Sequence, residues 1–186
     1  TKRTQGRKRL QMIDEMMDYV KKTYPMIRWK MIETENLFFE ERVKINCFYC
    51  GRYNNNWKCP PRIPDIDYKK MINEYCNKAF IYVEMPIDES NYEAVRKESS
   101  VYLHRAMLLC EKWLYQNNEP MALSFIGGAC KLCKNGCMPE RCANPYASRS
   151  PLEALGVNVM KSAASAGIEV KFPTTEYMMR IGLLLW

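Results

Sequence analysis

The sequence has 186 residues, of which 47% are hydrophobic and 12% aromatic. This length and composition indicate one domain with a packed core and exclude a disordered chain. No apolar run approaches the ~20 residues that cross a bilayer, and the basic, then amphipathic N-terminus lacks the apolar segment of a signal peptide. We therefore expect a soluble, cytoplasmic protein; its formal charge is +7.

Hydrophobic periodicity predicts helices and strands that alternate along the chain. Helices are expected over residues 7–22, from about 65, over 91–116 and over 151–166. Strands are expected over residues 27–33, 42–46, 79–85, 121–126, 168–172 and 180–186. Ser150 is expected to cap the last helix, with Glu153 in the position of a capping box and Gly167 at the end. This order predicts a single-domain α/β sandwich over residues 1–186, with a central sheet.

Cysteine is unusually frequent, with nine residues in a chain expected to be intracellular. Disulfides are disfavoured in that compartment, so clustered thiols there bind metal or carry out redox chemistry. Seven of the nine cysteines fall in two segments, 47–61 and 127–149, each of which is expected to be a loop that follows a strand. Both segments are therefore candidate metal-binding loops.

The loop 127–149 carries four cysteines with the spacing Cys130-x2-Cys133-x3-Cys137-x4-Cys142. This spacing is close to the ferredoxin run C-x2-C-x2-C-x3-C-P, in which thiolates hold an iron–sulfur cluster. Four thiolates on a compact loop suit one cluster or one tetrahedral ion.

The loop 47–61 offers three more cysteines, Cys47, Cys50 and Cys59, and two prolines follow the last of them. Zinc is the alternative to iron–sulfur, because the first two cysteines of each loop could form a pair of zinc knuckles. That pairing would leave the other three cysteines without a role. Unligated thiols are the third alternative.

Four other features bear on function. Cys76 and Cys110 lie inside expected helices and are interpreted as small buried hydrophobic residues. His104, the only histidine, shares a helix face with Glu111, and these two residues are the candidate catalytic groups; a structural histidine is the alternative. The three-cysteine set leaves one metal position without a cysteine from its own loop. Cys76, Cys110 or His104 is expected to fill this position, or the iron there is exposed.

The N-terminal segment 1–24 is expected to be a basic helix, because five of its first nine residues are Lys or Arg. A solvated tail is the simplest interpretation, and an arm that binds nucleic acid is the alternative. Part of the excess charge would offset bound metal, since seven thiolates around two cluster cores of about +2 each would bring the chain to about +4.

The segments CFYCGRYNNNWKCPP and FIGGACKLCKNGCMPERCANPYASRSPLEALGV, with His104 and Glu111 on the helix between them, resemble the uncharacterised "predicted metal-binding protein" family, a cysteine-rich domain of unknown function. The resemblance covers residues 45–172. It implies that metal is bound by the residues at the matching positions, which are Cys47, Cys50, Cys59, Cys130, Cys133, Cys137 and Cys142.

These observations favour an oxygen-sensitive protein that binds two [4Fe-4S] clusters and transfers electrons to a partner enzyme. One alternative is an enzyme that uses an open iron of the three-cysteine cluster as a Lewis acid for dehydration or desulfuration. Another is a zinc-stabilised binding module. The expected partner is a redox protein or a small-molecule substrate, with nucleic acid as the alternative and no membrane contact.

Overall fold

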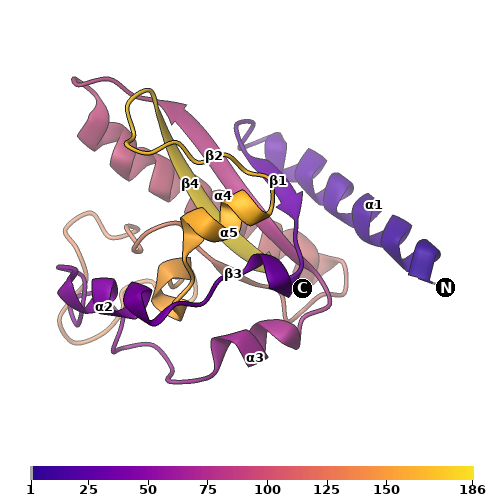
Figure 1. Cartoon of the computed structure of the whole chain (residues 1–186), viewed down its shortest axis with the longest axis horizontal. Coiled ribbons are helices and arrows are strands. Elements are labelled where there is room, and N and C mark those ends of the chain that lie inside the picture. The colour runs from indigo at the N-terminus through magenta and orange to yellow at the C-terminus, as the bar shows by residue number, and fades with distance from the viewer. Residues whose placement is uncertain (1) are drawn as a thin grey trace.

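The computed structural model describes the backbone of residues 2–186 and the side chains of residues 9–186. Four strands form one antiparallel sheet in the order β1-β2-β4-β3 (Figure 1). They are β1 (Arg28–Met31), β2 (Lys78–Pro86), β3 (Leu123–Phe125) and β4 (Tyr177–Leu185). The two longest strands, β2 and β4, lie at the centre and pair along their whole lengths.

Helices cover both faces of this sheet. The α-helices are α1 (Lys2–Lys21), α2 (Glu41–Tyr49), α3 (Tyr68–Asn73), α4 (Tyr92–Gln116) and α5 (Val159–Ser165), and the 3-10 turns are η1 (Thr34–Asn36) and η2 (Leu152–Leu155). Helices α1 and α4 pack on one face, whereas α3, η2 and α5 contribute to the apolar cluster on the other. The predicted α/β fold with a central sheet is confirmed.

Strand β2 shows why the sheet is buried on both faces. Ile81 and Val83 face the cluster formed with α1 and α4, and Phe80 faces the opposite cluster. All three are fully buried, and each such side chain contributes about 1.5–3 kcal/mol of hydrophobic free energy. Helix α4 packs closely on the neighbouring strand β4 at Gly182, where a Cβ would lie 2.4 Å from the Met107 sulfur. This close packing fixes the position of α4 relative to the sheet.

One predicted strand is wrong, because residues 42–46 lie in helix α2. The alternation of Val43 and Ile45 with polar residues suggested a strand, but the segment pairs with no strand of the described chain. Its neighbour Glu40 instead donates its backbone N–H to Gly156 O, 2.8 Å away. The first cysteine segment therefore begins in the last turn of a helix and does not follow a strand.

The segment after the second cysteine loop also differs from expectation. Ser150 caps no helix, because its carbonyl accepts the Ile126 N–H at 2.9 Å in a short bridge beside the sheet. The expected single helix is divided into η2 and α5 by Gly156, whose φ of +87° is left-handed. Residues 168–172 form no strand, and Cys76 is exposed in the bend after α3, so both of these expectations are wrong.

Two expectations concern the N-terminus and the membrane. The basic helix is present as α1, but the side chains of Lys2, Arg3, Arg7 and Lys8, on which a nucleic-acid arm would depend, lie outside the described residues. Among the helices that the structure describes, none is both long and apolar enough to span a bilayer.

Candidate metal centre

The second cysteine loop leaves the end of β3 through two glycines. A Cβ at Gly127 would lie 2.8 Å from the Ile181 carbonyl oxygen, so only glycine lets the chain cross so close to β4. Gly128 has a φ of +79°, a left-handed conformation that glycine adopts without strain. The two glycines turn the chain sharply away from the sheet. Residues 127–149 then continue without helix or strand.

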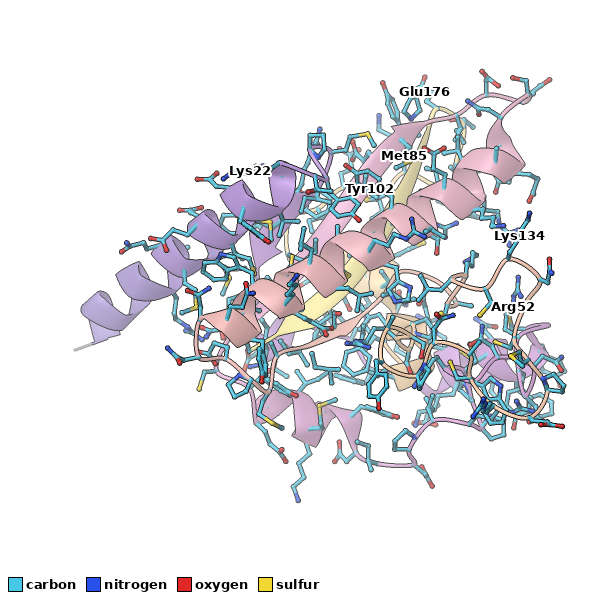
Figure 2. All side chains as sticks on the ribbon, turned by 180° about the vertical axis from the view of Figure 1, so that it is seen from behind. Lys22, Arg52, Met85, Tyr102, Lys134 and Glu176 are labelled. Atoms are coloured by element: carbon cyan, nitrogen blue, oxygen red, sulfur yellow. The ribbon has the colours of Figure 1, made fainter. Side chains whose placement is uncertain are left out.

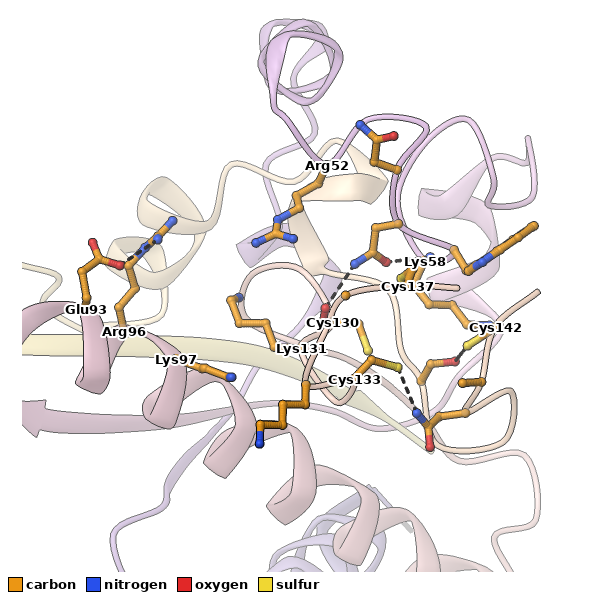
Figure 3. Close-up of a pocket in the computed structure, with 18 residues that line it drawn as sticks. Arg52, Lys58, Glu93, Arg96, Lys97, Cys130, Lys131, Cys133, Cys137 and Cys142 are labelled. Carbon is orange, nitrogen blue, oxygen red and sulfur yellow. Dashed lines mark hydrogen bonds and ion pairs between the residues drawn. The ribbon is translucent and has the colours of Figure 1, made fainter. Parts of the chain in front are cut away.

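All four cysteines of this loop line one cavity of about 280 Å³ (Figure 3). Six cationic side chains line the same cavity, against the single carboxylate of Glu93; they are Arg52, Lys58, Arg96, Lys97, Lys131 and Lys134. Arg52 and Lys131 line this cavity from different cysteine segments (Figure 3). Burial and the neighbouring arginines lower the pKa of Lys131 to about 8. The cavity is therefore suited to anionic groups, including thiolates.

Polar groups already contact the sulfurs of this set. Asn144 donates its side-chain N–H to Cys133 Sγ at 3.2 Å, and Cys142 Sγ lies 3.3 Å from Ser148 Oγ. Burial raises the pKa of the Cys130 thiol, while nearby backbone N–H groups lower it. The Asn144 side chain and these backbone N–H groups are donors, and such donors stabilise a thiolate and orient it for a metal.

Helix α4 holds the far end of the loop in place. Arg149 donates through Nε to Glu111 Oε1 at 2.9 Å and forms a second bond to the other carboxylate oxygen. His104 is buried with Nε2 2.8 Å from Ala147 O, and burial lowers its pKa to about 4. The histidine is therefore neutral near pH 7. Both candidate catalytic residues, His104 and Glu111, thus contact the C-terminal end of the loop, and neither residue lines the four-cysteine cavity.

The first cysteine segment is delivered by the end of helix α2. Cys47 lies in the last turn, and Cys50 is the C-cap, with its N–H donating to Cys47 O at 3.2 Å. Cys59 follows a tight turn and is only 5% exposed. Burial, followed by the proximity of the other two thiols, raises the pKa of Cys59 to about 12. All three cysteines line another cavity, of about 460 Å³, which is called here the three-cysteine cavity.

Glu153 lines the three-cysteine cavity together with the three thiols. Its Oε2 is buried without a hydrogen-bond partner. Burial raises the pKa of the carboxyl group, and the N–H groups of Glu153 and Gly128 together with Arg180 and Lys131 act in the opposite direction. Cys47 Sγ lies 3.8 Å from the backbone oxygen of Glu153.

The two cysteine segments contact each other directly. Asn56 donates its side-chain N–H to Cys130 O at 3.1 Å, and Trp57 Nε1 donates to Met138 O at 2.7 Å. Arg52 lines both cavities. Seen from behind, Arg52 and Lys134 lie at the same end of the molecule, away from Lys22 on the N-terminal side (Figure 2). Both cavities therefore belong to one end of the fold.

The donor chemistry of the two cavities fits a metal or cluster. Each cavity collects thiols, which ligate zinc or iron once deprotonated. The three-cysteine cavity is also lined by Glu153, which has one buried carboxylate oxygen without a donor. Among the side chains that the structure describes, however, no three from His, Cys, Asp or Glu are close enough to hold a single ion. Cys76 and Cys110 are absent from both sets: the first is exposed elsewhere, and the second is fully buried in α4.

Sequence analysis missed several polar residues at these cavities, chiefly Glu153, Asn144 and Asn56. The spacing of three residues between Ser150 and Glu153 predicts a capping box, and it does not predict that Glu153 lines a cavity. The signal that could have found it is its place inside the segment that resembles the metal-binding family.

Searches of curated proteins and of solved structures gave no match to the chain. A search of protein families did give one: residues 30–186 match the family described as "Predicted metal-binding protein (DUF2284)". The match includes both cysteine segments, α4 and the whole sheet except the first two residues of β1. The chain therefore belongs to this family of predicted metal-binding proteins, as the cysteine motifs implied.

Proposed function

We propose that the protein binds two iron–sulfur clusters, most simply [4Fe-4S] clusters, and transfers electrons to a partner protein. The observation that carries the proposal is the division of seven cysteines between two neighbouring cavities, four thiols in one and three in the other. Thiolates are the usual protein ligands of iron–sulfur clusters. Membership of a metal-binding family agrees with the proposal and specifies no metal.

The placement of the thiols argues against one zinc ion held by both C-x2-C pairs, because the two pairs line different cavities. A single zinc in either cavity would also leave the cysteines of the other cavity without a metal.

When bound, the clusters supply one-electron redox chemistry. The cysteine thiolates would hold the clusters. In the four-cysteine cavity, Asn144 would donate a hydrogen bond to a ligand sulfur, and the six cations would offset the negative charge of the thiolates. Arg52, which lines both cavities, and Asn56, which joins the two segments, would keep the two centres close enough to exchange electrons.

The partner that this surface favours is an acidic redox protein. Arg52, Lys97 and Lys134 are exposed and line the four-cysteine cavity. A patch of one charge speeds encounter with a partner of opposite charge, and salt weakens this steering. Electron transfer should therefore slow as ionic strength rises.

Catalysis is the second candidate function, because the first set has only three thiols in a larger cavity. Three cysteines leave one metal position for another ligand. If a substrate can reach that position, the metal can act as a Lewis acid, as dehydration or desulfuration would require.

The test is anaerobic purification of the full chain followed by iron, acid-labile sulfide and zinc analysis. We expect a brown protein with iron and sulfide sufficient for two clusters, and oxidation by an acidic electron acceptor at a rate that falls with added salt. Stoichiometric zinc without sulfide, even after anaerobic reconstitution, would contradict the iron–sulfur proposal. Bound clusters that exchange no electrons with acidic acceptors would favour catalysis instead.

A further inference from the structure

Glu153 lies in the cavity of the three-cysteine set and has one unused ligand atom. Its Oε2 is buried and lacks a hydrogen-bond partner. A buried carboxylate oxygen without a donor is costly, and nearly all such atoms in folded proteins have a partner. A group bound in the cavity that Glu153 lines could supply the missing partner.

The thiols of Cys47 and Cys59 are the neighbours of this carboxylate. Cys47 Sγ lies 3.8 Å from the Glu153 backbone oxygen. Cys59 lines the same cavity as Glu153 and is only 5% exposed. Three thiols and a carboxylate, all acids, repel one another once ionised. A bound metal cation removes this repulsion and uses all four groups.

The other candidate ligands lie elsewhere. Cys76 is exposed after α3, Cys110 is fully buried within α4, and His104 contacts the carbonyl of Ala147. Among the described residues that line the cavity, Glu153 is the only carboxylate, and no histidine or fourth cysteine is present.

We propose that Glu153 is the fourth protein ligand of the metal centre held by Cys47, Cys50 and Cys59, through Oε2. The inference rests on the proposed iron–sulfur function and deepens it. A carboxylate is a harder ligand than a thiolate and binds iron of a cluster differently from the other three positions. The two centres would thus differ in kind, one with four sulfur ligands and the other with three sulfurs and one oxygen.

The experiment compares the full-length wild type with Glu153→Gln, which keeps the shape of the side chain and removes its charge. Both are reconstituted anaerobically with ⁵⁷Fe and sulfide and examined by Mössbauer spectroscopy. In the wild type we expect one iron of one cluster to differ from the other irons because it has an oxygen ligand. In Glu153→Gln this distinct iron should change its spectrum and bind added cyanide, which the wild type resists. Glu93→Gln, at the other cavity, is the matched control and should resemble the wild type.

Mild oxidation provides a second measurement. Ferricyanide takes one electron from a [4Fe-4S]²⁺ cluster, which releases Fe²⁺ and leaves [3Fe-4S]⁺, detectable by electron paramagnetic resonance. Loss of the weakly held iron should be several-fold faster in Glu153→Gln than in the wild type. It should be slower in Glu153→Cys, where a thiolate replaces the carboxylate.

The outcomes separate this inference from the proposed function. A wild-type cluster whose irons all have sulfur ligands, or equal iron loss in wild type and Glu153→Gln, would overturn the role of Glu153 while the clusters stand. If Glu153→Gln does not fold, the wild-type spectrum still decides. If the wild type takes up zinc and no sulfide, the iron–sulfur proposal fails. X-ray absorption at the zinc edge then tests whether Glu153 is a ligand. An oxygen ligand that is lost in Glu153→Gln supports this role, and zinc with only sulfur ligands overturns it.

Discussion

The two cysteine-bearing regions present the same chemical group on different frameworks. In the first, helix α2 delivers Cys47 and Cys50, and the buried Cys59 lines the same cavity as Glu153, which has one carboxylate oxygen without a hydrogen-bond partner. In the second, an irregular loop carries four half-buried thiols in a cationic cavity. The first region is shaped by a helix and by burial, whereas polar contacts with α4 shape the second. If the four thiols bind a metal as proposed, we expect the order of the second region to depend on that metal more strongly than the order of the first.

The largest expected effect separates the two regions by their metal. Cys133→Ser/Cys137→Ser and Cys47→Ser/Cys50→Ser should each lose about half of the bound iron and sulfide, because each set would hold one of the two proposed clusters. Metal analysis and visible absorption measure the loss. Cys76→Ser, an exposed cysteine away from both cavities, is the control and should lose none. Complete loss of metal in either double variant would show that the two sets form a single site.

The next effect concerns the anchor of the second loop. Arg149→Met leaves the half-buried Glu111 carboxylate without its ion-pair partner. Breaking such a pair costs about 3 kcal/mol of unfolding free energy, to be measured by urea denaturation, and the metal of the second set should be lost more readily. In the control Arg28→Met, the Glu84 pair is more exposed, so the loss should be clearly smaller. Equal losses in the two variants would refute the anchoring role.

His104 should make the second region sensitive to acid. Burial lowers its pKa to about 4, so in the folded state it stays neutral while the unfolded chain takes up a proton below about pH 6.5. Stability is thus full above that pH and falls by up to about 3 kcal/mol as the pH drops to about 4. Denaturation of wild type and His104→Gln across this range isolates the effect. Parallel pH curves for the two proteins would rule out this contribution.

The smallest expected effect is on proteolysis. Removing metal should increase cleavage in both cysteine segments, and several-fold more in 127–149 than in 47–61, because the former contains no helix or strand. Limited proteolysis with mass spectrometry identifies the sites. Strand β2, at the centre of the sheet, provides the internal control and should stay intact. Identical cleavage with and without metal would mean that packing alone orders both segments.

Strong local patterns were sufficient to predict most elements of the fold. The helical spacing of Ile13, Met17 and Val20 predicted α1, and the apolar runs of β2 and β4 predicted the central strands. The prediction of a strand at residues 42–46 was wrong because a short alternating segment carries no information on whether a partner strand exists. The prediction of one helix over residues 150–167 was wrong because a bridge to Ile126 competed with the expected helix cap.

The sequence by itself determined the seven candidate ligands, because cysteine spacing is local and thiols have few other uses in such loops. It also determined the α/β class, since periodicity follows from backbone geometry. Only the tertiary structure decided that the two C-x2-C pairs line separate cavities and that His104 contacts a loop carbonyl. It alone placed Glu153 beside Cys47, 106 positions earlier in the chain. Such contacts depend on how distant segments pack around the sheet, and no local pattern records them.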